Sequence, residues 1–189
     1  MITLTLILQL ALPLIVGALA YYVGALDGLS SIVGIIIGYL VIFSRGTEGL
    51  NWFLIFLTFF VASIMATKYK YKEKEAYDLS QQKRRIGNVL GNGLAPVSFA
   101  IIGNPGGFIA ALATATADTL SSEIGVLSPI EPVSILDFKT KVKRGSNGGV
   151  SNLGNTFMFF GAGLIGFLGL VLFQSWPLFW IGLWGGVFG

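Results

Sequence analysis

The sequence contains no cysteine and no histidine among its 189 residues. Without cysteine the chain has no disulfide bond and no thiol nucleophile, and without either residue it lacks the ligands of haem and of His/Cys zinc sites. A metal ion would therefore have to be a hard cation bound by oxygen atoms, and Mg²⁺ is the ion we expect. Charged residues are also scarce: they make up 11% of the chain, whereas a soluble domain has about a quarter.

Apolar residues dominate instead, at 54% of the chain, together with 26 glycines that suit close helix packing in lipid. We expect an all-α fold, a polytopic transmembrane helix bundle that forms a single integral membrane domain over residues 1–189. About six or seven spans are predicted, some of them short or broken, from the apolar segments 1–26, 30–43, 51–67, 86–102, 105–125, 150–173 and 176–189. The first segment lacks a basic flank, so we interpret it as a first helix and not as a signal peptide.

Two polar connections separate these segments, at about residues 68–85 and 126–149. They carry seven and four of the twelve Lys and Arg residues, and Arg45 is the remaining one. The positive-inside rule places both connections in the cytoplasm, which predicts a cell-membrane protein with its polar site facing the cytoplasm. Most of the first connection fits a solvated linker lying on anionic lipid, and only its last three cations are expected at a site: Lys83, Arg84 and Arg85.

The stretch "ATADTLSSEIG" (115–125) places two carboxylates, Asp118 and Glu123, in an apolar segment. Five residues correspond to about 140° around a helix, so the two acids do not share a face. A break in the helix would let both reach one Mg²⁺; alternatively, Asp118 binds metal while Glu123 pairs with a neighbouring lysine, arginine or backbone N–H. A purely structural ion pair or a helix end at the interface is the third interpretation. Three hydroxyls are candidate ligand or phosphate contacts: Thr119, Ser121 and Ser122.

The stretch "KRGSNGGVSNLG" (143–154) combines Lys143 and Arg144 with a glycine-rich turn. Such a turn, opening a helix, presents free N–H groups and a positive dipole end to a phosphate. The candidate contacts are Ser146, Asn147, Gly148 and Gly149. The pattern is not a Walker A motif, and a flexible turn with lysines at the membrane surface is the alternative.

The stretch "KRRIGNVLGNGLAP" (83–96) follows the first polar connection. Its asparagines, Asn88 and Asn92, are four residues apart and face the same way on a helix. They are candidates to bind a nucleotide base, a ribose or a phosphate. Basic anchoring at the membrane surface and glycine-mediated packing explain part of the pattern.

Acids for Mg²⁺, cations and a glycine-rich turn for phosphates are the groups that phosphoryl transfer needs, and a membrane site suggests a lipid acceptor. The segments "ATADTLSSEIG", "GSNGGVSNLG" (145–154) and "RRIGNVLGNG" (84–93) resemble the membrane family that includes plant phytyl-phosphate kinase of the vitamin E pathway. By this resemblance Asp118, Ser122 and Glu123 match the acid and hydroxyl motif, Asn147 to Gly149 match the glycine-rich turn, and Asn92 matches an Asn-Gly pair. Family members usually continue into an Asp-Ser motif, expected after "WGGVFG" (184–189).

The resemblance implies a magnesium-dependent kinase that transfers the γ-phosphoryl group of a nucleotide triphosphate, CTP, to an isoprenoid monophosphate such as phytyl or geranylgeranyl phosphate. Asp118 and Glu123 would hold the metal, and Lys143 and Arg144 would neutralise phosphates. The expected partners are this lipid, the nucleotide and the bilayer, with no nucleic acid. Two alternatives stay open: an ion- or proton-coupled transporter, whose acids would lie near the midplane, and a cytidylyltransferase that forms a CDP-lipid.

Overall fold

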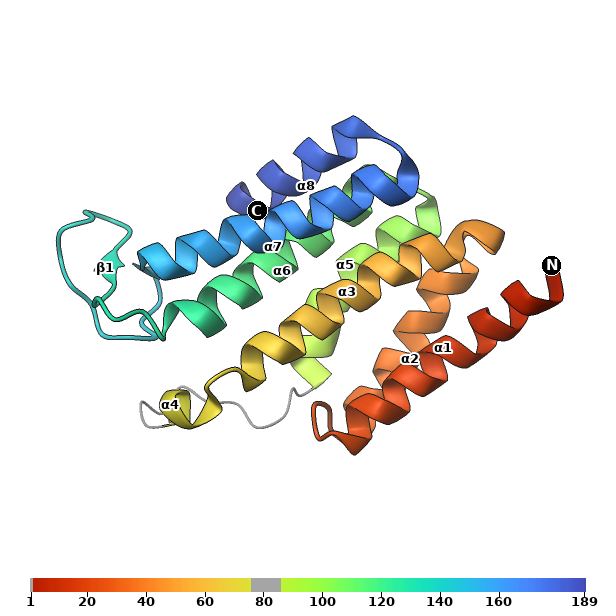
Figure 1. Cartoon of the computed structure of the whole chain (residues 1–189), viewed down its shortest axis with the longest axis horizontal. Helices are drawn as coiled ribbons and strands as arrows, with labels where there is room; N and C mark the ends of the chain where they lie inside the picture. Colours follow the sequence, from red (N-terminus) through yellow and green to blue (C-terminus); the bar gives the residue numbers. More distant parts are fainter. Residues whose placement is uncertain (1, 76–85) are drawn as a thin grey trace.

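The computed structural model describes residues 2–75 and 86–189, and this part of the chain is a helical bundle (Figure 1). Its long helices are α1 (Ile2–Tyr22), α2 (Gly28–Phe43), α3 (Gly49–Lys68), α5 (Ile86–Ile102), α6 (Pro105–Gly125), α7 (Asn152–Phe173) and α8 (Trp176–Phe188). The short elements are a 3₁₀ turn η1 (Gly46–Glu48), α4 (Tyr71–Glu75) and two antiparallel strands, β1 (Val133–Ser134) and β2 (Gly149–Val150). The prediction of an all-α polytopic bundle is confirmed, and the helices lie close to the expected segments.

Length and hydropathy mark three segments in the described residues as able to cross a membrane: Leu4–Tyr22, Gly46–Lys68 and Asn152–Phe173. Helices α2, α5 and α8 are apolar but shorter. Large apolar side chains point outward from these helices, including Leu14, Ile36 and Phe160, each more than half exposed. Such side chains are stable in contact with lipid tails, which are as apolar as they are.

Helix α6 lies at the centre of the bundle and packs against α3, α5, α7 and α8 (Figure 1). Its apolar side chains Phe108, Ile109 and Leu112 are fully buried. Because its neighbours separate much of it from lipid, α6 tolerates more small and polar residues than an isolated span would. This explains how a helix with two carboxylates stays inside the bundle.

The helices around α6 approach one another closely. A Cβ atom on Gly182 of α8 would lie 2.5 Å from the Cα atom of Gly166 of α7, so no side chain fits there and the two backbones touch. Farther along, Trp52 of α3 packs on Phe108 of α6 and Phe173 of α7, with ring centroids 4.7 and 5.2 Å apart. Glycine contacts and aromatic packing thus hold the bundle together.

We use the term loop end for the end of the bundle where α3 and α6 finish and α7 begins. Lys68 donates to the carbonyl of Val23 at 2.7 Å, which joins the end of α3 to the end of α1. Ser151 donates to the carbonyl of Gly125 at 3.2 Å, which joins α7 to α6. Residues 126–149 and the described part of the first polar connection both lie at this end (Figure 1). The described parts of both connections therefore lie at the same end of the bundle, and their placement in the cytoplasm stays a prediction.

Candidate functional site

The two carboxylates of α6 sit on one continuous helix from Pro105 to Gly125. The arrangement that requires a helix break near residues 119–122 is therefore wrong, because this segment keeps its helical hydrogen bonds. Asp118 and Glu123 point in different directions, as the 140° spacing predicts. Asp118 is exposed, whereas Glu123 is half-buried against α3.

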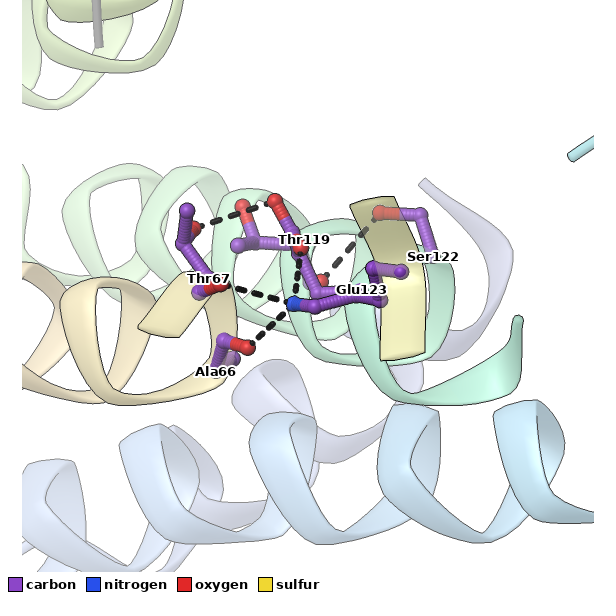
Figure 2. A network of polar contacts seen from close by, with 6 residues as sticks. Ala66, Thr67, Thr119, Ser122 and Glu123 are labelled. Carbon is purple, nitrogen blue, oxygen red and sulfur yellow. Dashed lines mark hydrogen bonds and ion pairs between the residues drawn. The ribbon is translucent and has the colours of Figure 1, made fainter. Parts of the chain in front are cut away.

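Glu123 takes part in a compact polar network with Lys74 of α4. Nζ of Lys74 lies 2.7 Å from Oε2 of Glu123. The same ammonium donates to the carbonyls of Ala66 at 2.9 Å and Thr67 at 2.7 Å, in the last turn of α3. The hydroxyl of Thr67 donates to Oε1 of Glu123 at 3.0 Å. Figure 2 shows Ala66, Thr67 and Glu123 converging on this single nitrogen.

Lys74 is the residue that the sequence interpretation missed. Its side chain is 1% exposed, although the stretch around it reads as a solvated linker. The last carbonyls of a helix lack intrahelical donors, and a lysine near a helix C-terminus can satisfy them. Lys74 does this for α3 and at the same time gives Glu123 a counter-charge. These contacts agree with a pairing of Glu123 with a neighbouring lysine, which both the second interpretation above and a purely structural ion pair include.

The hydroxyls near Asp118 bond to their own helix. Ser121 donates to the carbonyl of Asp118 at 3.1 Å, and Ser122 donates to that of Thr119 at 3.2 Å. Thr119 is buried, whereas Ser122 is exposed one turn beyond Asp118. Asp118 and Ser122 therefore form the exposed polar strip of α6. Nearby, Thr114 donates to the carbonyl of Gly185 at 2.9 Å, so the end of α8 lies one turn from Asp118.

The glycine-rich turn lies in the loop between α6 and α7. Gly148 adopts a positive φ of 73°, and the amide of Gly149 donates to the carbonyl of Ser146 at 3.0 Å. The turn was expected to open directly into a helix, but β2 intervenes and α7 begins only at Asn152. Ser151 caps that helix by accepting a hydrogen bond from Gly154 N at 3.1 Å. The chain's own serine therefore already accepts from one of the free N–H groups at the start of α7.

The loop is fastened to the end of α6. Arg144 is half-buried and donates to the carbonyl of Val126 at 3.1 Å. A Cβ atom on Gly154 would lie 3.1 Å from the carbonyl oxygen of Ser121, so the start of α7 touches the backbone of the acidic segment. Lys143, Ser146 and Asn147 are exposed on the same loop. The acidic segment and the "SNGG" loop therefore share the loop end of the bundle.

The described chain does not gather three or more Asp or Glu side chains into a group able to hold a metal ion. Asp118 is the carboxylate best placed to take part in magnesium binding, since both oxygens of Glu123 already accept hydrogen bonds. One available carboxylate fits an Mg²⁺ ion that is bound to a nucleotide. Such an ion takes one or two protein carboxylates and completes its shell with phosphates and water.

Asn88 and Asn92 share a face of α5, as predicted, but that face lines an apolar groove between α1, α2, α3 and α5. None of the described residues that line this groove belongs to α6 or α7. The groove itself therefore does not bring the two asparagines together with the carboxylates. The predicted phosphate contacts Lys83, Arg84 and Arg85 lie outside the described residues.

These features define a polytopic membrane helix bundle with an acidic segment and a glycine-rich basic loop at one end. The chain belongs to the family described as integral membrane protein DUF92, which it matches over residues 11–189. It is 34% identical over 166 residues to an uncharacterized membrane protein of Methanocaldococcus jannaschii, covering 85% of this chain and 66% of that protein.

A plant relative is Protein PGR of Arabidopsis thaliana, which is 31% identical over 145 residues, or 64% of this chain and 50% of that protein. The chain thus spans about half to two thirds of the length of these relatives. No solved structure matches.

Proposed function

We propose that this protein is a CTP-dependent kinase of isoprenoid monophosphates, such as phytyl or geranylgeranyl phosphate, with its site on the cytoplasmic side of the cell membrane. The proposal rests on the resemblance of its three motifs to the family of plant phytyl-phosphate kinase. The observation that supports it most is the attachment of the "SNGG" loop to the acidic segment, through Arg144 and Ser151. A nucleotide phosphate site needs carboxylates and cations within one such region.

Asp118 would hold Mg²⁺ together with phosphate oxygens of the nucleotide, with Ser122 beside it as a further oxygen ligand or phosphate contact. The metal would supply neutralisation of the charge that accumulates on the triphosphate. Glu123 takes a different role in this proposal. By fixing Lys74 and Thr67 it holds α6 against α3, and so sets the position of Asp118 one and a half turns away.

Lys143 and Arg144 would neutralise the phosphates, and the "SNGG" turn would donate backbone N–H groups. The backbone N–H of Gly149 already donates to the carbonyl of Ser146 within the turn. The backbone N–H groups of Asn147 and Gly148 are therefore the better candidates to donate to a phosphate. Lys83, Arg84 and Arg85 remain further candidates from the sequence. This division leaves no residue acting as a covalent nucleophile.

The reaction would begin with attack of an acceptor phosphate oxygen on the γ-phosphorus of CTP. A new P–O bond forms, the bond from the γ-phosphorus to the β,γ-bridging oxygen breaks, and CDP leaves with that electron pair. The acceptor phosphate is already ionised at neutral pH, so the chain needs no general base. Positioning and charge neutralisation account for catalysis of this type.

The location of the acids bears on the alternatives. Glu123 is in the last turn of α6, and Asp118 lies about 10 Å from the end of that helix by the helical rise. Acids near one end favour a site for a water-soluble nucleotide over a transporter, which needs access from both sides. A cytidylyltransferase would use the same groups, and only its products distinguish it.

The test is to reconstitute the protein in lipid nanodiscs with Mg²⁺, geranylgeranyl or phytyl monophosphate, and CTP, ATP, GTP or UTP in turn. A kinase releases CDP and isoprenoid diphosphate, whereas a cytidylyltransferase releases pyrophosphate and a CDP-lipid. If no nucleotide gives a diphosphate product, the kinase proposal is rejected. If the same protein then carries ions into proteoliposomes, the transporter alternative is supported.

A further inference from the structure

A narrow apolar groove lies between α1, α2, α3 and α5 of the described bundle, with a cavity volume of about 60 Å³ inside about 670 Å³ of empty space that includes the open surroundings. Aromatic and aliphatic side chains and glycines line it, including Phe56, Leu57 and Phe60 of α3 and Gly34 of α2. An empty apolar recess between membrane helices is a place for an apolar molecule.

The groove is polar at one place only, among the residues that line it. Asn88 and Asn92 project from the first two turns of α5, and every other lining side chain is apolar or a glycine. The start of α5 belongs to the loop end, as does Leu26 at the start of the groove. Pro13 and Phe53 lie at the opposite limit of the groove, deeper in the bundle. The groove therefore has a polar end toward the loop end and an apolar interior.

A single stripe of α3 connects the groove to the ion pair. Phe56, Phe60, Ser63 and Thr67 follow one another at intervals of four, three and four residues, so they share one face of the helix. The first two line the groove, and Thr67 donates to Glu123. From Phe60 to Thr67 the helical rise is about 10 Å. A polar head that leaves the groove at Asn88 and Asn92 is thus within a short distance of the acidic segment.

We propose that this groove holds the single apolar tail of the isoprenoid monophosphate, with the phosphate end near Asn88 and Asn92. The inference rests on the proposed function and gives the lipid a position that is separate from the "SNGG" loop. A nucleotide would leave its many polar groups without partners against an apolar wall. A single apolar chain from the bilayer matches the polarity of the groove.

Gly34 offers a way to fill the groove. A Cβ atom on this residue meets only Cδ1 of Leu26 at 3.7 Å, so a side chain can be added without displacing the backbone. In the variant Gly34→Leu the added leucine side chain should fill part of the groove. Gly91→Leu is the matched control, because it adds the same side chain to an exposed position of α5 that has no atom within 4 Å and does not line the groove.

The experiment uses a geranylgeranyl monophosphate analogue with a photoreactive diazirine near the end of its tail. After irradiation in nanodiscs, mass spectrometry maps the labelled residues. We expect labels on α1, α2, α3 or α5, at least fivefold weaker labelling in Gly34→Leu, and unchanged labelling in Gly91→Leu. If Gly34→Leu does not fold, Leu57→Phe replaces it, since Leu57 is a half-buried lining residue.

Labelling outside the groove, or equal labelling of the filled and control variants, overturns the groove proposal. Diphosphate synthesis is measured on the same samples. If the wild type synthesises the diphosphate but is labelled outside the groove, the groove proposal is rejected and the kinase proposal is kept. If the groove is labelled but no nucleotide gives the diphosphate, the kinase proposal is rejected and the groove is a lipid-binding site.

Discussion

Nζ of Lys74 lies 2.7 Å from Oε2 of Glu123, and this contact joins α4 to the end of α6. An ammonium group has three N–H donors, and here the carbonyls of Ala66 and Thr67 accept the other two. The charge is therefore paired and every donor is used, which is the condition under which a lysine can be fully buried. Three helices meet at this one nitrogen.

Replacing Lys74 by methionine should destabilise the protein. The change leaves Glu123 without its counter-charge and removes the cap on α3. Breaking a buried ion pair costs about 3 kcal/mol or more, and since the Glu123 side chain is 21% exposed, we expect a loss of roughly 2–3 kcal/mol. Thermal unfolding in detergent measures it.

Lys72→Met is the control, because Lys72 is exposed in the same short helix. It should unfold at the wild-type temperature. In the double variant Lys74→Met/Glu123→Gln the unpaired charge is gone, so part of the loss should be recovered. Equal unfolding temperatures for Lys74→Met and Lys72→Met would show that the pair contributes nothing.

Asp118→Asn should separate activity from stability. The side chain is exposed and makes no hydrogen bond or ion pair with the described residues, so thermal unfolding should be unchanged. If Asp118 holds Mg²⁺, the loss of several kcal/mol of charge stabilisation should lower kcat/KM for diphosphate synthesis about 100-fold or more.

The control for Asp118 is Glu131→Gln, an exposed acid of the loop that pairs only with the exposed Lys141 at 3.2 Å. Its kcat/KM and its Mg²⁺ dependence should match the wild type. A fully active Asp118→Asn variant would show that Asp118 does not hold the metal ion.

Gly154→Val should disturb the contact between α7 and the acidic segment. Its Cβ atom would lie 3.1 Å from the carbonyl oxygen of Ser121 and 3.4 Å from the Cα atom of Gly125, both backbone atoms. Overpacking of this kind costs about 1–3 kcal/mol. Gly163→Val on the same helix is the matched control, because its Cβ atom would meet only Leu183 at 3.9 Å. The difference in unfolding temperature tests the contact, and equal values would refute it.

Asp137 organises the loop between α6 and α7 in a pH-dependent way. The Thr140 hydroxyl donates to its carboxylate at 2.6 Å, with the amides of Thr140 and Lys139 at 3.0 and 3.1 Å. The hydrogen bond from the Thr140 side chain, followed by the backbone bonds, holds the pKa of Asp137 below its usual value. A lowered pKa stabilises the folded loop above the ordinary value, near 3.9, and this contribution is lost as the pH falls through the lowered pKa.

A ¹³C NMR titration of the Asp137 carboxyl group measures this pKa. We expect a midpoint below that of an unstructured aspartate, and a return toward the ordinary value in Thr140→Val, which loses the hydroxyl. A normal midpoint in the wild type would mean that the turn does not form in solution.

Hydropathy and charge predicted the bundle well. Apolar segments 51–67 and 105–125 became α3 and α6 nearly to the residue, because a membrane span depends mainly on the local sequence. The same reasoning placed the basic connections at one end. The five-residue spacing of the two acids also predicted their divergence, since the geometry of a regular helix fixes it.

The partner of Glu123 could not be predicted in this way. Lys74 returns to the end of α3 because Tyr69 is extended and Lys70 adopts a positive φ of 48°, which is uncommon outside glycine. The alternating Lys and Tyr residues give no sign of that turn. The groove beside Asn88 and Asn92 depends likewise on how four helices pack, which periodicity along one helix does not encode.

The position of α6 inside the bundle sets an order for its insertion into the bilayer during synthesis. An aspartate inside a span opposes release from the translocon into lipid by up to about 2.5–3.5 kcal/mol, and α6 is not one of the three segments with the length and hydropathy of an independent span. Helix α6 should therefore stay beside the translocon, or slip back, until α7 emerges and covers its small-residue face. A ribosome-bound chain that stops before α7 would leave Asp118 and its helix accessible to water-soluble reagents.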